Sequence, residues 1–387
     1  MANTSSNACI IERVNQLNQA NLQLVKQLRH ELHQHPEVSL QETWTKQHLI
    51  DFLKEHTKLE IIDRGLWFYA IYHAGANRRN IAFRADFDAL PMPEGIDLPY
   101  GSRCPGVSHK CGHDGHAAAL AGFALEIDQQ GAGQNIFFLF QPAEEIGAGG
   151  EPCSVLIKEE QIEEIFAFHN MSGMPFRSVN VIDNTAHCAS RGMTIHMQGI
   201  PSHASQPEAG INPALAIAAI ILAIPDLIAP EKHQGLVLCT VIQVDIGEKA
   251  FGISASMGDL RLTIRAEQET ELDRLQQTLE ELAAALALRD GLTVRVSYND
   301  IFPETFNHKE SVDKIRRAAK ANGLEVRELT KAQRGSEDFG YYTKLTKGAI
   351  CYLGNGENYP PLHTFGFDFR DELLETAITL FLGLTKE

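Results

Sequence analysis

Residues 111–116 read Cys-Gly-His-Asp-Gly-His, and the interpretation of the whole chain starts from them. Cys111 and His113 stand two positions apart, so both side chains can face one side of an extended or turning segment. A thiolate and an imidazole offered together suit a borderline divalent metal ion. The stretch therefore predicts part of a metal site, and the other ligands must come from elsewhere in the chain.

Composition limits the classes of protein to consider. The chain of 387 residues is too long for one ordinary core, and its net charge of −16 argues against nucleic acid or an anionic membrane as a partner. Residues 1–11 contain no apolar segment of a secretory signal, and the apolar run 214–228 is broken by Pro225 and Asp226. The seven scattered cysteines are typical of reduced thiols. We expect a cytoplasmic protein with two domains.

Two patterns of secondary structure divide the chain. In its first and last parts, apolar strands end in polar residues and alternate with helices, which predicts an α/β domain with a site at the C-terminal edge of its sheet. The strands are expected at 81–84, 135–140, 165–168 and 349–353, and the main helices at 22–35, 42–56, 116–128, 155–164, 311–322 and 371–384.

The middle of the chain follows a β-α-β-β-α-β order, which predicts a ferredoxin-like α+β domain. Its strands are expected at 193–197, 236–244, 256–265 and 292–298, and its helices at 212–227 and 270–288. We therefore expect residues 187–302 to form a domain inserted into a discontinuous catalytic domain of residues 1–186 and 303–387.

Five potential metal ligands are assigned to the strand-end edge of the α/β part: Cys111, His113, Glu145, His169 and His363. A thiolate, a carboxylate and three imidazoles suit zinc, manganese, cobalt or nickel, and five ligands exceed the needs of one tetrahedral ion. Two ions sharing them can lower the pKa of a water and polarise a carbonyl. Glu144 is then available as a general base, and Asp88 can orient a ligand.

Each of these residues also has an ordinary explanation when it is taken alone. A cysteine in a glycine-flanked loop is usually a buried thiol, and a Glu-Glu pair is usually a solvated turn. The segment His30-Glu31-Leu32-His33 does not have the His-Glu-x-x-His spacing, so His33 and His35 are expected at the surface or at a helix end. The convergence of five candidates on one sheet edge favours the metal site.

The chain resembles the aminoacylase/hippurate hydrolase family of dinuclear metal amidohydrolases, in the branch of bacterial N-acyl-amino-acid amidohydrolases and plant auxin-conjugate hydrolases. The matching segments occur in the expected order over nearly the whole chain. They are Arg29–Glu37, Arg84–Pro91, Cys111–His116, Gln141–Glu145, His169, Gly335–Phe339 and Leu362–His363.

The resemblance implies a fold, a site and an activity. The fold is a zinc-exopeptidase-like domain with a central mixed sheet and an inserted ferredoxin-like lid, through which such proteins form a homodimer or higher oligomer. The metal ligands are the five residues named above, and Glu144 is the base. His203 of the lid stabilises the oxyanion, and Ser336 and Arg265 bind the substrate, with Arg261 as the alternative to Arg265 for the substrate carboxylate. The substrate is an N-acetyl or aromatic N-acyl amino acid, a related small conjugate or a short peptide.

Three segments depart from the family pattern: 204–208, 170–175 and 258–265. They leave the substrate open. Two other functions also stay open. In one, Cys111 is a nucleophile activated by His113 or His116, which leaves the other candidate ligands without a role. In the other, the chain is a non-catalytic metal-binding protein, although Glu144 is present.

Overall fold

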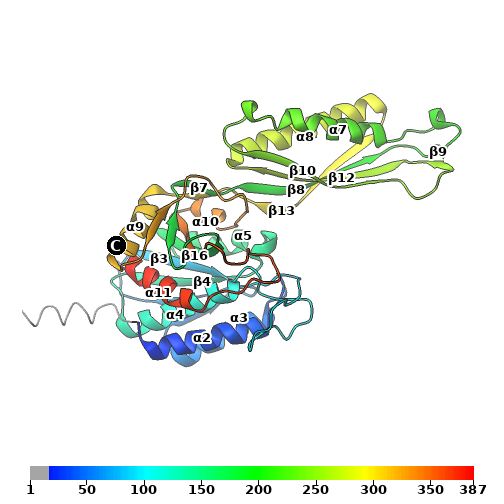
Figure 1. Cartoon of the computed structure of the whole chain (residues 1–387). Coiled ribbons are helices and arrows are strands. Elements are labelled where there is room, and N and C mark those ends of the chain that lie inside the picture. The colour runs from blue at the N-terminus through cyan, green and yellow to red at the C-terminus, as the bar shows by residue number, and fades with distance from the viewer. Residues whose placement is uncertain (1–16) are drawn as a thin grey trace, which may run out of the picture. The chain divides into compact units, whose positions relative to one another are not determined.

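The computed structural model describes residues 17–387, which form two compact units (Figure 1). Within the described residues, unit 1 comprises residues 17–186, Phe306–Lys331 and Asp338–Glu387, and unit 2 comprises His187–Thr305 and Ala332–Glu337. The expectations for the N-terminal signal segment and for Cys9 fall on residues 1–16 and lie outside the described residues. Unit 2 includes the segment with Ser336, which the predicted layout assigned to the catalytic domain.

Unit 1 is built on one mixed sheet in the order β1-β2-β4-β3-β5-β16-β6-β15. Strands β4, β3, β5 and β16 are neighbours and run parallel, so their C-terminal ends meet at one edge. The α/β class with a central mixed sheet is confirmed. The strands are β1 Glu60–Asp63, β2 Phe68–Tyr72, β3 Asn80–Asp86, β4 Asn135–Gln141, β5 Glu164–Ser172, β6 Val179–Val181, β15 Val326–Glu328 and β16 Lys347–Gly356.

Both faces of this sheet are covered by helices. In β4, Phe138 and Phe140 pack into one core while Phe137 and Leu139 pack into the other, which explains the continuous apolar run in this strand. The first core contains residues of α2 Gln19–Gln34, α3 Thr43–His56, α4 His113–Gln130, α9 Lys309–Ala321 and α11 Glu372–Leu384. The second contains residues of α5 Gly150–Cys153, α6 Val155–Glu159 and α10 Gly340–Thr343.

Helix α4 begins three residues earlier than predicted. Gly112 precedes its first residue, His113, and has a φ of 94°. A Cβ atom at Gly112 would lie 2.4 Å from Oδ1 of Asn170. Glycine is therefore required here both for the left-handed backbone and for the close approach of Asn170. Cys111 therefore precedes the turn at Gly112, and His113 follows it as the first residue of α4.

Unit 2 is an antiparallel sheet in the order β10-β12-β8-β13, with α7 and α8 packed on one face through an apolar core. Its elements follow the β-α-β-β-α-β order of a split βαβ unit. They are β8 Ala189–Gln198, α7 Ala214–Leu227, β10 Val237–Ile246, β12 Met257–Ala266, α8 Glu269–Asp290 and β13 Thr293–Phe302.

Two small sheets complete the chain. Strand β9 Ser202–His203 pairs with β11 Ile253–Ser254 inside unit 2. Strand β7 Asn184–His187 lies where the chain leaves unit 1, and it pairs with β14 Thr305–Asn307, where the chain returns.

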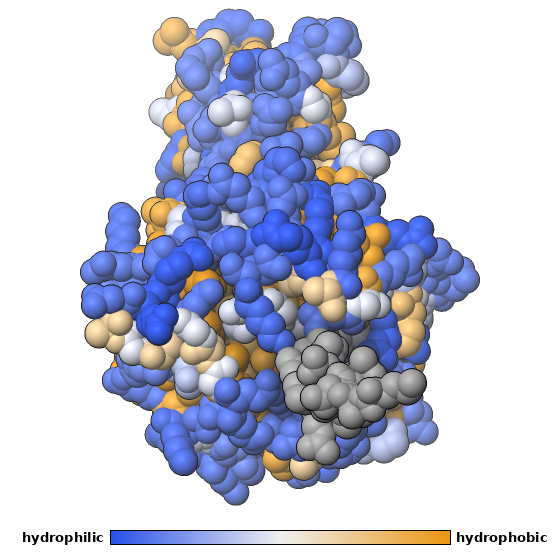
Figure 2. Space-filling model, turned by 90° about the vertical axis from the view of Figure 1, so that its left-hand side faces the viewer, coloured by the Kyte–Doolittle hydropathy of each residue, from blue (hydrophilic) through white to orange (hydrophobic). Residues whose placement is uncertain are grey.

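The surface and the cysteines follow the expectations from composition. Hydrophilic side chains cover most of the face drawn in Figure 2. Among residues 17–387, no helix is long and apolar enough to cross a bilayer. The six cysteines in this range are free thiols, as predicted.

A buried network of charges around Arg84 joins three segments of unit 1. Its guanidinium donates to Gln141 Oε1 at 2.8 Å, to Asp86 Oδ2 at 2.7 Å and to Asp338 Oδ1 at 2.9 Å. Asp338 Oδ2 also accepts a hydrogen bond of 2.7 Å from the backbone of Gly150. The planar guanidinium therefore ties the ends of β3 and β4 to the loop before α10.

We expect Arg84→Met to lower the free energy of unfolding of unit 1 by about 3–5 kcal/mol, because the carboxylates of the network would remain buried without their cation. Both tryptophans, Trp44 and Trp67, belong to unit 1, so tryptophan fluorescence during urea unfolding measures this effect. Lys347→Gln, which removes an exposed pair with Glu310, is the control and should leave the value unchanged. Equal midpoints for both variants would contradict the role of Arg84.

Candidate metal centre

The five predicted ligands lie together at the C-terminal edge of the unit 1 sheet. Glu145 follows β4, His169 lies in β5, and His363 belongs to the loop after β16. Cys111 and His113 reach the same edge from the start of α4. Because the parallel strands end side by side, residues far apart in sequence become neighbours.

The donor atoms face a common centre. Sγ of Cys111 lies 3.3 Å from Nε2 of His363 and 3.5 Å from Nε2 of His169. Glu145 Oε2 lies 3.5 Å from Nε2 of His363, and Glu145 Oε1 lies 3.8 Å from Nε2 of His113. Two groups of donors within 4.8 Å of one another meet at Cys111: Cys111 with His113 and His169, and Cys111 with Glu145 and His363.

Two of these donor atoms are buried and lack a hydrogen-bond partner. They are Nε2 of His113 and Oε1 of Glu145. Buried polar atoms normally have partners, because desolvation without a hydrogen bond is unfavourable. Both atoms are donors that a borderline divalent cation accepts. The chemistry of the cluster therefore fits a metal ion.

Asp88 holds two parts of the cluster at once. Its Oδ1 accepts a hydrogen bond of 3.1 Å from Nδ1 of His113, which leaves Nε2 of that ring free toward the centre. Its Oδ2 accepts hydrogen bonds from the backbone of Glu145 at 3.0 Å and from Ser39 Oγ at 2.7 Å. His169 is oriented in a similar way, since its Nδ1 donates to the carbonyl of Asn170 at 2.7 Å.

The site also perturbs the pKa values of its own members. Burial and the neighbouring Glu145 and Glu144 raise the pKa of the Cys111 thiol well above its usual range. Burial raises the pKa of Glu145 to about 7. Burial alone would lower the pKa of His113, but Asp86 and Asp88 raise it to about 10. A cation that binds these donors must therefore displace protons.

Glu144 follows a strained turn. It is buried, and its Oε2 lies 3.9 Å from Nε2 of His113. The preceding residue, Ala143, has φ 53° and ψ 37°, a left-handed conformation that costs a non-glycine residue about 1–2 kcal/mol. The backbone N–H of Ala143 donates to Oε1 of Glu42 at 2.8 Å. The turn directs Glu144 and Glu145 toward the same centre.

Two neighbouring clusters have the residue types of a metal site, but other groups already pair with them. Asp114 accepts from Arg29 Nε at 2.9 Å and contacts His33 Nδ1 at 2.8 Å. His33 lies in the last turn of α2, as the helix-end expectation has it, but it is fully buried, because this carboxylate and Glu94 provide its partners. His116 is paired on both ring nitrogens, with Asp86 and with Asn170.

The remaining predicted site residues belong to unit 2. His203 is exposed in β9, and its Nδ1 lies 2.7 Å from Ser205 Oγ. Arg265 donates to Ser336 Oγ at 2.7 Å, so these two predicted substrate-binding residues lie together. Arg261 instead pairs with Asp259 at 3.1 Å. Arg265 therefore contacts the other predicted substrate-binding residue, whereas Arg261 is paired with a carboxylate of its own strand.

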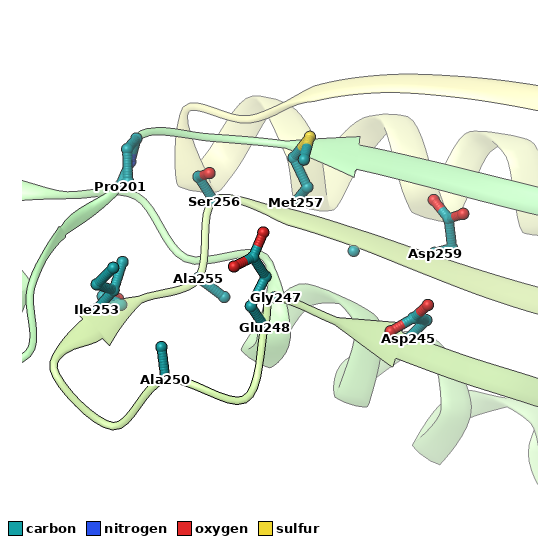
Figure 3. A pocket seen from close by; sticks show the side chains of 12 residues that line it. Pro201, Asp245, Gly247, Glu248, Ala250, Ile253, Ala255, Ser256, Met257 and Asp259 are labelled. Atoms are coloured by element: carbon teal, nitrogen blue, oxygen red, sulfur yellow. The ribbon is translucent and has the colours of Figure 1, made fainter.

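Unit 2 also contains a pocket of about 420 Å³ beside the β9–β11 pair (Figure 3). Asp245, Glu248 and Asp259 are among its lining residues, so it is acidic. Asp259 is already bound to His196 at 2.7 Å. None of the predicted site residues lines this pocket.

Sequence reasoning missed three side chains that support the cluster. Asp86 is fully buried and faces both His116 and His113. Glu42 and Asn170 are also buried beside the site. Asp86 could have been found from its place at the end of an apolar strand. Nothing in the local sequence distinguishes Glu42, whose partner is 101 residues away.

Comparison with protein families gives one match over most of the chain. The model of peptidase family M20/M25/M40 matches residues 82–387. A hippurate hydrolase of Campylobacter jejuni is 27% identical over 368 residues, which cover 93% of this chain and 95% of that protein. An N-acetyldiaminopimelate deacetylase of Bacillus velezensis is 26% identical over 362 residues, covering 92% and 96%. An N-acetylcysteine deacetylase of Bacillus subtilis is 27% identical over 365 residues, covering 92% and 94%.

Solved structures with the same fold cover nearly the whole chain. A crystal structure of a Bacillus subtilis protein described as a dinuclear metal binding peptidase from the M20 family has a TM-score of 0.81 at 25% identity, and covers 95% of this chain and 98% of that one. A crystal structure from methicillin resistant Staphylococcus aureus has a TM-score of 0.87 at 24% identity, covering 95% and 96%.

We expect Asp88→Asn to weaken Zn²⁺ affinity about 10–100-fold, because the amide cannot accept hydrogen bonds on both sides and His113 loses its fixed orientation. Competition with a fluorescent chelator measures the affinity. Ser39→Ala removes one hydrogen bond to Asp88 but keeps the carboxylate, so its effect should stay below about threefold. Wild-type affinity in Asp88→Asn would contradict the orienting role.

Proposed function

Because the chain belongs to peptidase family M20/M25/M40, we propose that it is a metal-dependent amidohydrolase that cleaves the amide bond of an N-acyl amino acid, a related small conjugate or a dipeptide. The relatives named above act, by their names, on hippurate, N-acetyldiaminopimelate and N-acetylcysteine, all of which are N-acyl amino acids. The observation that supports this proposal most strongly is the convergence of five donor side chains, of which His113 Nε2 and Glu145 Oε1 are buried without hydrogen-bond partners.

Cys111, His113, Glu145, His169 and His363 would hold two divalent ions, chosen from zinc, manganese, cobalt or nickel. The two donor groups that meet at Cys111 support a pair of ions rather than one. When bound, such ions supply Lewis-acid polarisation of the amide carbonyl and lower the pKa of the attacking water. Asp88 keeps His113 and the backbone of Glu145 in place for them.

Glu144 acts as the general base in this proposal. Its carboxylate accepts a proton from the attacking water and then passes that proton to the nitrogen of the leaving amine. Burial of Glu144 beside His113 supports this role, because a carboxylate shielded from solvent keeps its proton within the site. The amide C–N bond breaks as the amine nitrogen is protonated.

Unit 2 would complete substrate binding. We assign the substrate carboxylate to Arg265 and Ser336, because no carboxylate of residues 17–387 pairs with Arg265, whereas Arg261 is already bound to Asp259. His203 would stabilise the oxyanion of the tetrahedral intermediate by donating a hydrogen bond. Ser205 contacts Nδ1 of this exposed imidazole, which leaves Nε2 for such a contact.

The competing functions receive less support. A nucleophilic Cys111 needs a thiolate, but burial and two carboxylates raise the pKa of its thiol. Activity that survives complete metal removal would favour the thiol mechanism all the same. A non-catalytic metal-binding protein would have no use for the buried Glu144.

We also propose that unit 2 forms a homodimer or higher oligomer in the cytoplasm. Strand β10 is an edge strand, and its side chains Val241, Ile242 and Val244 are exposed. Leu215 and Leu222 of the adjacent α7 are each 80% exposed. An apolar edge strand of this kind favours pairing with a second copy.

We expect Glu144→Gln to lower kcat at least 100-fold on every substrate that the wild type cleaves, because the amide cannot accept the proton. The assay is a panel of N-acetyl amino acids, hippurate and dipeptides, with the metal-stripped protein restored by Zn²⁺, Mn²⁺, Co²⁺ or Ni²⁺. Metal content per chain should stay at the wild-type value.

Glu151→Gln, a matched change at an exposed residue of α5, is the control and should leave kcat within twofold. Turnover retained in Glu144→Gln would rule out the proposed base. Inactivity of the wild type with every metal and substrate would favour the non-catalytic alternative.

For the oligomer, we expect Ile242→Lys to shift the protein from dimer to monomer in sedimentation velocity, because a charge on the edge strand opposes pairing. Leu288→Lys changes an exposed leucine of α8, which contacts β13 at the opposite edge of the sheet, and should leave the dimer intact. A dimer that survives Ile242→Lys would place the interface elsewhere.

A further inference from the structure

Glu42 contacts the catalytic loop from a distant part of the chain. It is only 5% exposed and precedes the first residue of α3. Its side chain makes no capping hydrogen bond to that helix. Instead, Oε1 accepts the backbone N–H of Ala143 at 2.8 Å, across 101 residues of sequence. The carboxylate therefore serves the loop before Glu144 and not its own helix.

The backbone that Glu42 contacts is the strained residue of the loop. Ala143 is fully buried, with a φ of 53°. A left-handed alanine persists only where its surroundings hold it, and such residues concentrate at functional sites. Its carbonyl accepts a hydrogen bond of 3.0 Å from Ala148, which closes the loop on the other side.

Two carboxylates bracket Glu144 along the backbone. Glu42 accepts the N–H of residue 143, and Asp88 accepts the N–H of residue 145 at 3.0 Å. Asp88 also orients the ring of His113, so one carboxylate fixes the ligand side of the loop. Glu42 therefore binds the N–H of the residue that directly precedes Glu144, the proposed general base.

We propose that Glu42 is a positioning residue that sets the direction of Glu144 by holding Ala143 in its left-handed conformation. This inference rests on the proposed function, in which Glu144 is the general base. A general base must lie within hydrogen-bond reach of the proton it accepts, and a displacement of about 1 Å can lower the rate about 100-fold. Glu42 acts only through the backbone and does not touch the substrate.

The length of the side chain, and not its charge, should decide activity. Glu42→Gln keeps the acceptor oxygen at the same reach, and burial already raises the pKa of Glu42 to about 7, so a neutral acceptor is tolerated. Glu42→Asp keeps a carboxylate but is shorter by one methylene. We expect kcat of Glu42→Gln within fivefold of wild type, and kcat of Glu42→Asp and Glu42→Ala reduced about 10–100-fold with KM within threefold and metal content unchanged.

Hydrogen exchange tests the same contact without a substrate. The peptide of residues 141–148 should exchange faster in Glu42→Asp than in wild type or in Glu42→Gln, whether or not Zn²⁺ is added. Glu37→Gln is the matched control, because Glu37 accepts the N–H groups of Trp44 and Thr45 in the same helix and has no bond to the loop. It should leave both exchange and kcat at wild-type values.

A double mutant separates positioning from a general loss of packing. Glycine adopts a positive φ without a Cβ penalty, so the loss of kcat caused by Glu42→Asp should be smaller in an Ala143→Gly background. Equal losses in both backgrounds would overturn the proposed mechanism. So would wild-type exchange and kcat in Glu42→Asp, or an active Glu42→Asp beside an inactive Glu42→Gln.

Failure of this inference and failure of the proposed function give different results. If Glu144→Gln is inactive while every Glu42 variant is active on hippurate or the best N-acetyl amino acid of the panel, Glu144 keeps its role and Glu42 loses the proposed one. If Glu144→Gln is active, the base assignment fails, and the exchange experiment still decides whether Glu42 holds Ala143.

Discussion

The guanidinium of Arg84 is the contact on which the geometry of unit 1 depends. Buried ions are stable only when they are paired and hydrogen-bonded, so Arg84, Asp86 and Asp338 require one another. Gln141 joins the same network as the last residue of β4. The network thereby fixes the ends of β3 and β4 and the loop before α10. None of the five candidate metal ligands takes part in these hydrogen bonds.

The candidate metal centre is built outward from this frame. Asp86 is the last residue of β3 and Asp88 follows the strand, and each binds a histidine of the first turn of α4, His116 and His113 respectively. Imidazoles in this arrangement have one nitrogen fixed by a carboxylate and the other free for a cation. Only His113 is free in this way, since Asn170 takes the second nitrogen of His116. Two histidines of one short motif therefore have different partners.

The sequence could predict those features that depend on local pattern. Apolar runs ending in polar residues identified β3, β4, β5 and β16, and parallel strands brought Glu145 and His169 to one edge. The pattern could not identify Glu42 or the pairing of His33, because their partners lie 101 and 81 residues away and any acceptor or donor of the right length would look the same. The early start of α4 was missed because Gly112 resembles a helix breaker, whereas it forms the left-handed entry to the helix.

The pairing of β7 with β14 has a consequence for how this architecture can vary. The chain leaves unit 1 after Ala186 and returns at Phe306, through two strands that are hydrogen-bonded to each other. An insertion with adjacent ends can be lengthened, exchanged or removed without a change in the core of its host. Unit 1, which contains the candidate metal centre, and unit 2 can thus diverge independently. The short segment Ala332–Glu337 is the exception. It lies outside the insertion in sequence but belongs to unit 2, so we expect Ser336 to vary together with the inserted residues.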